Sequence, residues 1–102
     1  MYLSRDVLDA ADDFLQRERT SWTIVTAFPE LKGVILLDDG RPFLKIPFPS
    51  GGYVTIATMA RHRVLRWVAA VPDTPGLTIH EPSSLEEYPR LVGEALGLEH
   101  VA

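Results

Sequence analysis

The sequence predicts an α+β domain, in which one helix at each end flanks a predominantly antiparallel sheet of four to six short strands. Three observations predict this fold. Residues 4–18 carry apolar side chains at helical spacing, residues 22–71 consist of short apolar segments separated by turn signals, and residues 83–97 begin with capping residues and end in glycine. The length of 102 residues suits a single domain, spanning 1–102, with one modest core.

The first predicted helix covers residues 4–18. Ser4 is a suitable N-cap, and Asp6 lies in the first turn, where the helix dipole favours negative charge. Four aspartates and Gln16 occupy one side of this helix. Apolar residues recur on the other side, which we expect to pack on the sheet. They are Leu3, Val7, Ala10, Ala11, Phe14 and Leu15.

Two strands are predicted after this helix. Residues 22–28 are rich in types that suit a pleated surface, residues 29–33 form a turn signal, and the apolar run 34–37 is typical of a strand covered on both faces. Asp39-Gly40 predicts a two-residue type I′ hairpin turn, which would place residues 37 and 42 opposite each other. Because Pro42 lacks an N–H group, we expect residues 41–46 to form a sheet edge or to be irregular, with Pro47 as the end.

Residues 53–71 are compatible with two structures. They form either a hairpin, with strands Tyr53–Met59 and Val64–Val71, or an amphipathic helix over residues 55–71. We favour the hairpin because Leu65 interrupts the apolar face of the helical alternative. A surface loop follows at residues 71–76, where two prolines and a glycine occur, and residues 77–80 predict a short strand.

The second predicted helix follows two overlapping capping boxes, Ser83 with Glu86 and Ser84 with Glu87. Pro89 predicts a break or kink near residues 85–88, and Gly97 predicts the end of the helix. The side chains expected to face the core are Leu85, Tyr88, Leu91, Val92, Ala95 and Leu96.

Composition limits the classes of function. The net charge of −4 and the pI near 5.2 disfavour nucleic acid as a partner. The absence of cysteine excludes disulfides, thiolate metal sites and a cysteine nucleophile, and it is consistent with a reducing compartment. No apolar run approaches the eighteen residues of a membrane span, and the N-terminus lacks a signal-peptide pattern. We therefore expect a cytoplasmic protein.

No catalytic or metal-binding motif is recognisable. The three histidines, His62, His80 and His100, are about twenty residues apart, unlike the close spacing of common metal sites. We expect neither a metal nor a cofactor. His80 and Glu81 could supply a general acid and base, but no serine lies in a nucleophile context. The sequence therefore favours a protein without enzymatic activity.

The strongest candidate for binding is a basic cluster made of Arg61, His62, Arg63 and Arg66, with Trp67 beside it. Arginine and tryptophan are enriched in binding hot spots, although the cluster would equally suit a solvated hairpin tip paired with the acidic first helix. Phe43 and Phe48 add aromatic surface next to the predicted sheet edge. Natural proteins cover or pair such edges, so we expect a homodimer.

The layout of helix, strands and helix is similar to that of secretion-chaperone-like and YbjN-like domains. The usual chaperone plan has a helix between strands, which here would require residues 55–71 to be helical. No functional residue is transferred from this similarity, because fold does not determine function.

Three functions follow from these observations. The leading hypothesis is a protein-binding module, such as an adaptor, a chaperone-like protein or an inhibitor, acting as a homodimer. The alternative is a ligand-binding or hydrolytic domain with a pocket of His80, Glu81 and the arginines at 61, 63 and 66. A weaker hypothesis is nucleic-acid contact through the arginines.

Overall fold

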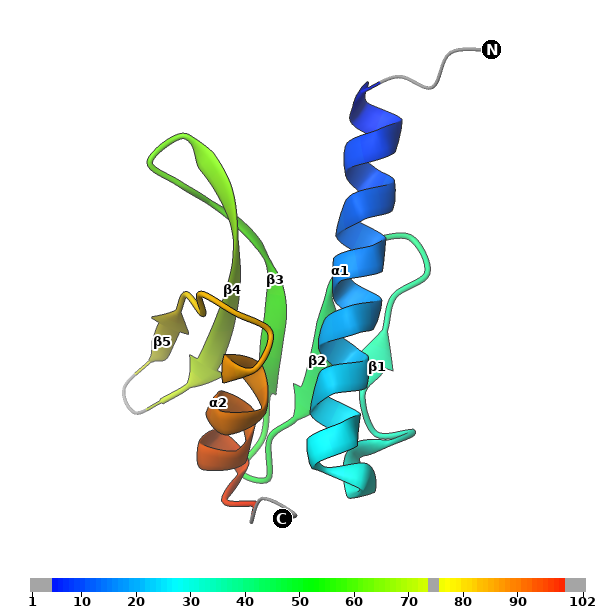
Figure 1. The fold of residues 1–102 in the computed structure, drawn as a ribbon. Coiled ribbons are helices and arrows are strands. Elements are labelled where there is room, and N and C mark those ends of the chain that lie inside the picture. Colours follow the sequence, from blue (N-terminus) through cyan, green and yellow to red (C-terminus); the bar gives the residue numbers. More distant parts are fainter. Residues whose placement is uncertain (1–4, 74–75, 99–102) are drawn as a thin grey trace.

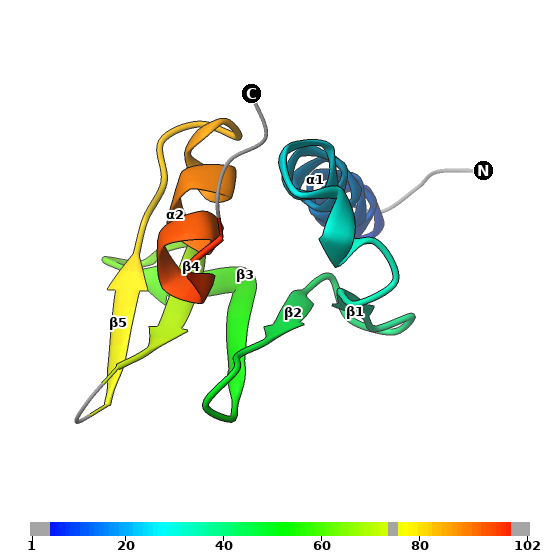
Figure 2. The ribbon, with the colours of Figure 1, turned by 90° about the horizontal axis from the view of Figure 1, so that it is seen from below.

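A computed structural model describes residues 5–73 and 76–98. It contains a five-stranded antiparallel sheet in the order β1-β2-β3-β4-β5, with both α-helices on the same face (Figures 1 and 2). The predicted α+β fold is confirmed. The elements are α1 (Arg5–Ala27), the 3-10 helix η1 (Pro29–Leu31), β1 (Leu36–Leu37), β2 (Leu44–Pro47), β3 (Tyr53–Arg61), β4 (Val64–Pro72), β5 (Leu77–His80) and α2 (Glu87–Leu96).

Helix α1 is longer than the sequence predicted. It continues to Ala27, so the strand expected at residues 22–28 is wrong. The hydroxyl groups of Thr20, Thr23 and Thr26 each donate a hydrogen bond of 2.7–2.8 Å to the backbone carbonyl four residues earlier. These polar groups are therefore satisfied within the helix. Thr20, Ile24 and Phe28 follow one another at four-residue spacing and are buried. Burial of this helical face therefore overrides the β-propensity of the segment.

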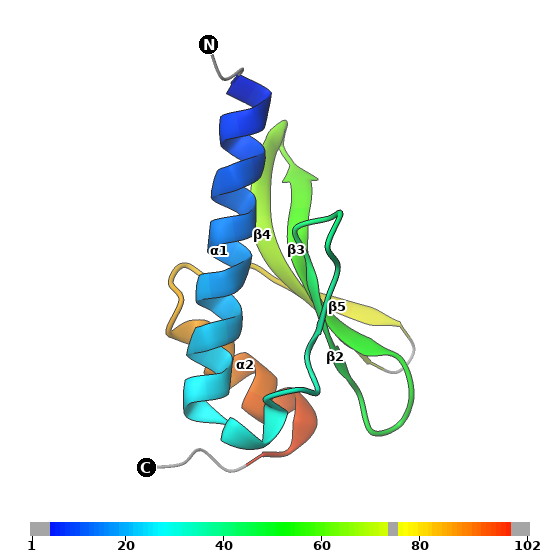
Figure 3. The ribbon, with the colours of Figure 1, turned by 90° about the vertical axis from the view of Figure 1, so that its right-hand side faces the viewer.

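The N-terminal half of α1 extends beyond α2 (Figures 1 and 3). Residues 8–12 are exposed, and Leu15 keeps 48% of its surface accessible. The expectation that Ala10, Ala11 and Leu15 pack on the sheet is wrong, because the packed face of α1 lies further along the helix. Leu3 and the cap residue Ser4 lie outside the described residues.

Strand β1 is short and exposed. The strand predicted at residues 34–37 is reduced to Leu36–Leu37, with 48% and 42% of their surfaces accessible, because this strand lies at the sheet edge. Leu37 pairs with Leu44, so residues 38–43 form a six-residue loop and the predicted register is wrong. The Asp38 carboxylate accepts the backbone N–H groups of residues 40 and 41, at 2.7 and 2.9 Å, and neither Asp39 nor Gly40 has a positive φ.

Arg17 fixes this loop to α1. It is a buried charged residue with 7% of its surface accessible, and its guanidinium donates to the carbonyls of Asp38 and Arg41. The Glu18 carboxylate balances the positive charge of Arg17, with Oε1 of Glu18 at 2.7 Å from Nη2 of Arg17. Strand β2, which follows the loop, pairs with β1 on one side and β3 on the other. Of residues 41–46, residues 41–43 are irregular, which is one of the two predicted alternatives. The predicted sheet edge is wrong for residues 44–46, because they lie in β2 between β1 and β3, and the predicted end at Pro47 is confirmed.

The hairpin predicted at residues 53–71 is confirmed as β3 and β4. Arg61 pairs with Val64, which leaves His62 and Arg63 as a two-residue turn. Their φ angles are 52° and 68°, in the left-handed region. The turn with positive φ at both central residues, expected at Asp39-Gly40, thus occurs where no glycine is present.

Helix α2 begins at Glu87 rather than directly after Ser84. Pro89 explains this late start. Proline has no N–H group to donate to the carbonyl of residue 85, and its ring would clash with that carbonyl in a helix. The predicted break is therefore confirmed. The capping interaction runs from Glu87, whose carboxylate accepts the backbone N–H groups of Ser83 and Ser84. Gly97, with φ 68°, ends the helix as predicted.

The core lies between the sheet and the two helices. The residues predicted to face inward from α2 do so: Tyr88 and Val92 are buried, and Leu85, Leu91, Ala95 and Leu96 pack around them. Phe28 lies so close to α2 that a Cβ atom at Gly93 would be 2.7 Å from its ring. Gly93 therefore sets how closely the end of α1 can approach α2.

We predict that Gly93→Ala lowers the free energy of unfolding by about 1–2 kcal/mol. Overpacking against the enclosed Phe28 ring outweighs the helix propensity that alanine gains over glycine, about 1 kcal/mol. Urea denaturation measures the effect. The same substitution in a Phe28→Leu background should cost less, and an equal cost in both backgrounds would contradict the steric explanation.

We also predict that stability falls in acid through Glu87. The hydrogen bonds from Ser83, through its backbone and side chain, and from the Ser84 backbone lower the pKa of Glu87 below 4.5. A lower pKa in the folded state means that the stabilisation is present above pH 4.5 and is lost as pH falls through the folded value. Urea denaturation between pH 7 and 3 should show a smaller loss for Glu87→Gln than for the wild type; parallel pH profiles would contradict this.

Candidate protein-binding groove

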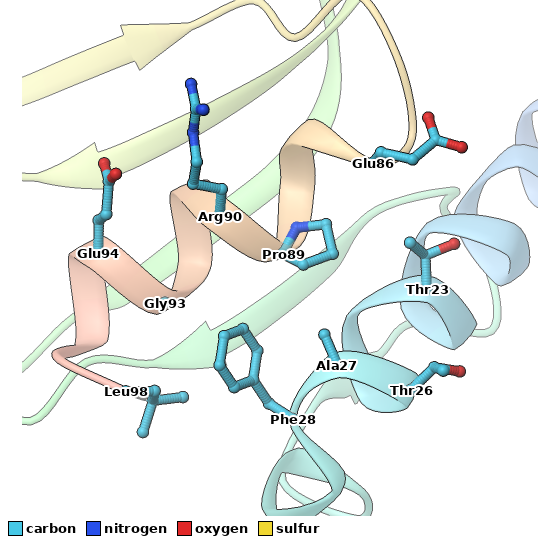
Figure 4. A pocket seen from close by; sticks show the side chains of 10 residues that line it. All are labelled: Thr23, Thr26, Ala27, Phe28, Glu86, Pro89, Arg90, Gly93, Glu94 and Leu98. Atoms are coloured by element: carbon cyan, nitrogen blue, oxygen red, sulfur yellow. The ribbon is translucent and has the colours of Figure 1, made fainter. Parts of the chain in front are cut away.

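An open groove of about 700 Å³ lies between the C-terminal part of α1 and helix α2 (Figure 4). We call it the interhelical groove. Its lining residues are Thr23, Thr26, Ala27, Phe28, Glu86, Pro89, Arg90, Gly93, Glu94 and Leu98.

The floor of the interhelical groove is apolar because both helices point small or aromatic groups toward each other. Phe28 and Ala27 from the end of α1 face Pro89 and the bare Cα of Gly93 on α2. Arg90 and Glu94 point away from Phe28 and form a charged margin on α2 (Figure 4). The groove thus combines an apolar floor with a polar rim, which is the usual composition of a protein interface.

A second hollow of about 600 Å³ lies beside the groove, and Thr23 lines both. Trp22 is the most exposed large apolar side chain there, with 72% of its surface accessible, and Val25 and Leu85 also line the hollow. An exposed tryptophan next to apolar hollows is a typical anchor for a partner. The helical surface therefore offers more binding area than the groove alone.

The basic cluster lies at the far end of the β3–β4 hairpin from this surface. Glu81 contacts two of its arginines, with carboxylate-to-Nε distances of 3.9 Å to Arg61 and 3.5 Å to Arg66. These arginines thus pair with the residue after β5, and no ion pair joins them to the acidic side chains of α1 from residue 8 onward. His62 and Arg63 form the exposed turn. The negative charge of Glu81 reduces the positive potential that a phosphate group would meet here.

Of the predicted aromatic residues, Trp67 lies beside the basic cluster, where it lines a hollow of about 440 Å³ with Arg66 and Glu81. Trp67 and Phe48 are both half-buried and pack against the core. Phe43 is half-buried next to Lys45, whose ammonium is 5.3 Å from the ring centre. The residues predicted for binding are therefore not brought together into one site.

His80 and Glu81 line a shallow hollow of about 300 Å³ with Glu87 and Arg90, and the arginines at 61, 63 and 66 are not part of its lining. Within residues 5–73 and 76–98, no three histidine, aspartate or glutamate side chains gather as metal ligands. His100 lies outside the described residues. The described residues that line the hollow at His80 include no serine, threonine or cysteine.

The interhelical groove was not predicted from the sequence. Trp22 and the residues up to Phe28 were expected in a strand, so α1 was not extended to the groove. The buried positions 20, 24, 28 and 31 recur at helical spacing, and this pattern could have indicated the longer helix.

Comparison with protein-family models, with curated proteins and with solved structures found no match. Of the described helices, none is both long and apolar enough to cross a membrane. The site must therefore be interpreted from its own chemistry.

We predict that replacing the turn by Asn-Gly, as His62→Asn with Arg63→Gly, raises the free energy of unfolding by about 1 kcal/mol. Left-handed backbone is costly for residues with side chains and suits Asn-Gly. Urea denaturation measures the change, with Arg61→Gly, at the last residue of β3, as a control expected to destabilise. A loss of stability in the turn variant would contradict a strained turn.

Proposed function

We propose that this chain is a non-enzymatic protein-binding module that receives an apolar segment of another protein in the interhelical groove. The observation that carries the proposal is the apolar lining of this groove, in which Ala27 and Leu98 are only half-buried and lie over the buried Phe28 and Pro89. The adaptor, chaperone-like and inhibitor roles are all forms of this activity. We further propose that it acts in the cytoplasm as a homodimer.

A protein segment suits the groove better than a small ligand does. The volume of about 700 Å³ is within the range of ligand pockets, but such pockets enclose most of the ligand surface. The groove is open to solvent between two helices, which is the geometry that accepts an amphipathic helix. A third helix placed there would bury apolar surface of both partners.

The charges near the groove favour a partner segment with basic residues at its margins. Glu86 and Glu94 line the groove together with a single arginine, Arg90, and the chain has a net charge of −4. Opposite charges around an apolar centre increase the association rate and select the partner. We therefore propose an amphipathic helix with apolar residues at positions i, i+3, i+4 and i+7 and with flanking lysine or arginine.

A blocked groove tests this proposal. Helical peptides selected from a phage-displayed library on the wild type should share the apolar spacing and basic margins described above. Thr26→Arg places a long cation in the groove at an exposed position, so it should weaken binding of these peptides by about tenfold or more, which corresponds to about 1.4 kcal/mol. Isothermal titration calorimetry measures the affinity.

Thr78→Arg is the matched control. Thr78 is also an exposed threonine whose hydroxyl makes one hydrogen bond, but it lies on β5. Equal binding to the wild type and to Thr26→Arg would overturn the proposed site. Native mass spectrometry that finds a small molecule retained by the purified protein, and lost in Thr26→Arg, would favour the ligand-binding alternative instead.

A further inference from the structure

Helix α1 carries an apolar stripe on the side opposite to the core. Leu8, Leu15 and Trp22 are separated by seven residues each and have 48%, 48% and 72% of their surfaces accessible. Ala11 lies between the first two at the spacing of a coiled-coil seam and is also exposed. We call these four residues the outer stripe.

The four side chains of the outer stripe lie on one side of the helix, and the remaining seam position, between Leu15 and Trp22, is occupied by the exposed Glu18. At 100° per residue the four side chains of the stripe fall in a sector of roughly 60°, because seven residues nearly complete two turns. Thr20 and Ile24, which face the core, lie on the other side of α1. A partner can therefore lie along α1 without displacing the sheet.

We infer that the outer stripe pairs with the same stripe of a second copy of this chain, in the antiparallel direction, around a two-fold axis at Leu15. This inference rests on the homodimer part of the proposed function and names its surface. A two-fold interface requires a self-complementary surface. Rotation about Leu15 sets Leu8 of each copy beside Trp22 of the other, so the two ends of the stripe meet.

The shape of α1 is self-complementary in this arrangement. Residues 8–12 are exposed, and this part of α1 extends beyond α2, whereas the C-terminal half of α1 bears the hollow lined by Glu18, Trp22 and Val25 (Figures 1 and 3). Antiparallel pairing places the exposed part of each helix along the hollow of the other. The helix of 23 residues is long enough for both contacts, since the stripe spans roughly 21 Å.

Charge also favours the antiparallel direction. Asp9 and Asp12 are exposed in the N-terminal half, and Arg19 is exposed in the C-terminal half. Antiparallel pairing brings Asp12 near Arg19 of the second copy and also level with its Glu18, so one attractive and one repulsive contact form there. Parallel pairing would bring only equal charges together. The helix dipoles are opposed as well, which is favourable for neighbouring helices.

Sedimentation equilibrium of the full chain tests the surface. The wild type should be a dimer, and Leu15→Glu should raise its dissociation constant by on the order of 100-fold, because two carboxylates would meet at the axis. Leu36→Glu is the matched control: Leu36 has the same accessible fraction, 48%, but lies on the sheet edge β1. Circular dichroism checks that both variants remain folded.

Disulfide trapping tests the direction and does not depend on Leu15→Glu. The chain has no cysteine, so single cysteines can be introduced without side reactions. A mixture of Leu8→Cys and Trp22→Cys should form the mixed disulfide on mild oxidation, and Leu15→Cys should link to itself. Leu8→Cys alone should link poorly, because its copies lie roughly 21 Å apart in the antiparallel pair.

The outcomes separate this inference from the proposed function. A dimer that persists in Leu15→Glu but dissociates in Leu36→Glu would overturn the outer stripe and assign the interface to the sheet edge. Efficient self-linking of Leu8→Cys would overturn the antiparallel direction. A wild type that stays monomeric at millimolar concentration would overturn both the stripe and the homodimer, while peptide binding in the groove is measured independently.

Discussion

The contact between Phe28 and Gly93 is the constraint on which the helical layer depends. Phe28 closes α1, and a Cβ atom at Gly93 would be 2.7 Å from its ring. The two helices therefore meet at this point on one face of the sheet. The groove lies above this buried contact, and the half-buried Ala27 and Leu98 are part of its lining.

The helical layer covers one face of the sheet unevenly. The core residues of β2 and β3 are fully buried. Neither helix covers the tip of the β3–β4 hairpin, and α2 does not reach the first turns of α1 (Figure 3). Arg17 compensates locally by fixing the loop before β2 to α1 through two carbonyl groups. Apolar side chains outside this covered region, such as Leu15 and Trp22, are the ones available to partners.

Local signals determined which parts of the fold could be predicted. The hairpin of β3 and β4 and the limits of α2 followed from strand-forming residues, Pro89 and Gly97. The extension of α1 did not, because residues such as Trp22 and Thr23 favour strands locally and only the burial of Ile24 and Phe28 makes the helix preferable. The strand register predicted from Asp39-Gly40 was wrong, because the Asp38 carboxylate accepts hydrogen bonds from the backbone N–H groups of residues 40 and 41 and so stabilises a different turn. The groove depends on both helices sharing one face, which no local pattern specifies.

The meander order of the sheet has a consequence for the rate at which the protein folds. Each strand pairs only with its neighbours in sequence, so every strand pairing closes a short loop. Such low contact order is associated with fast folding among small domains. The contact between Phe28 and Gly93 is an exception, because it joins the end of α1 to α2 with all five strands between them in the sequence. Its formation closes a long loop, so the sheet can assemble before the two helices come together.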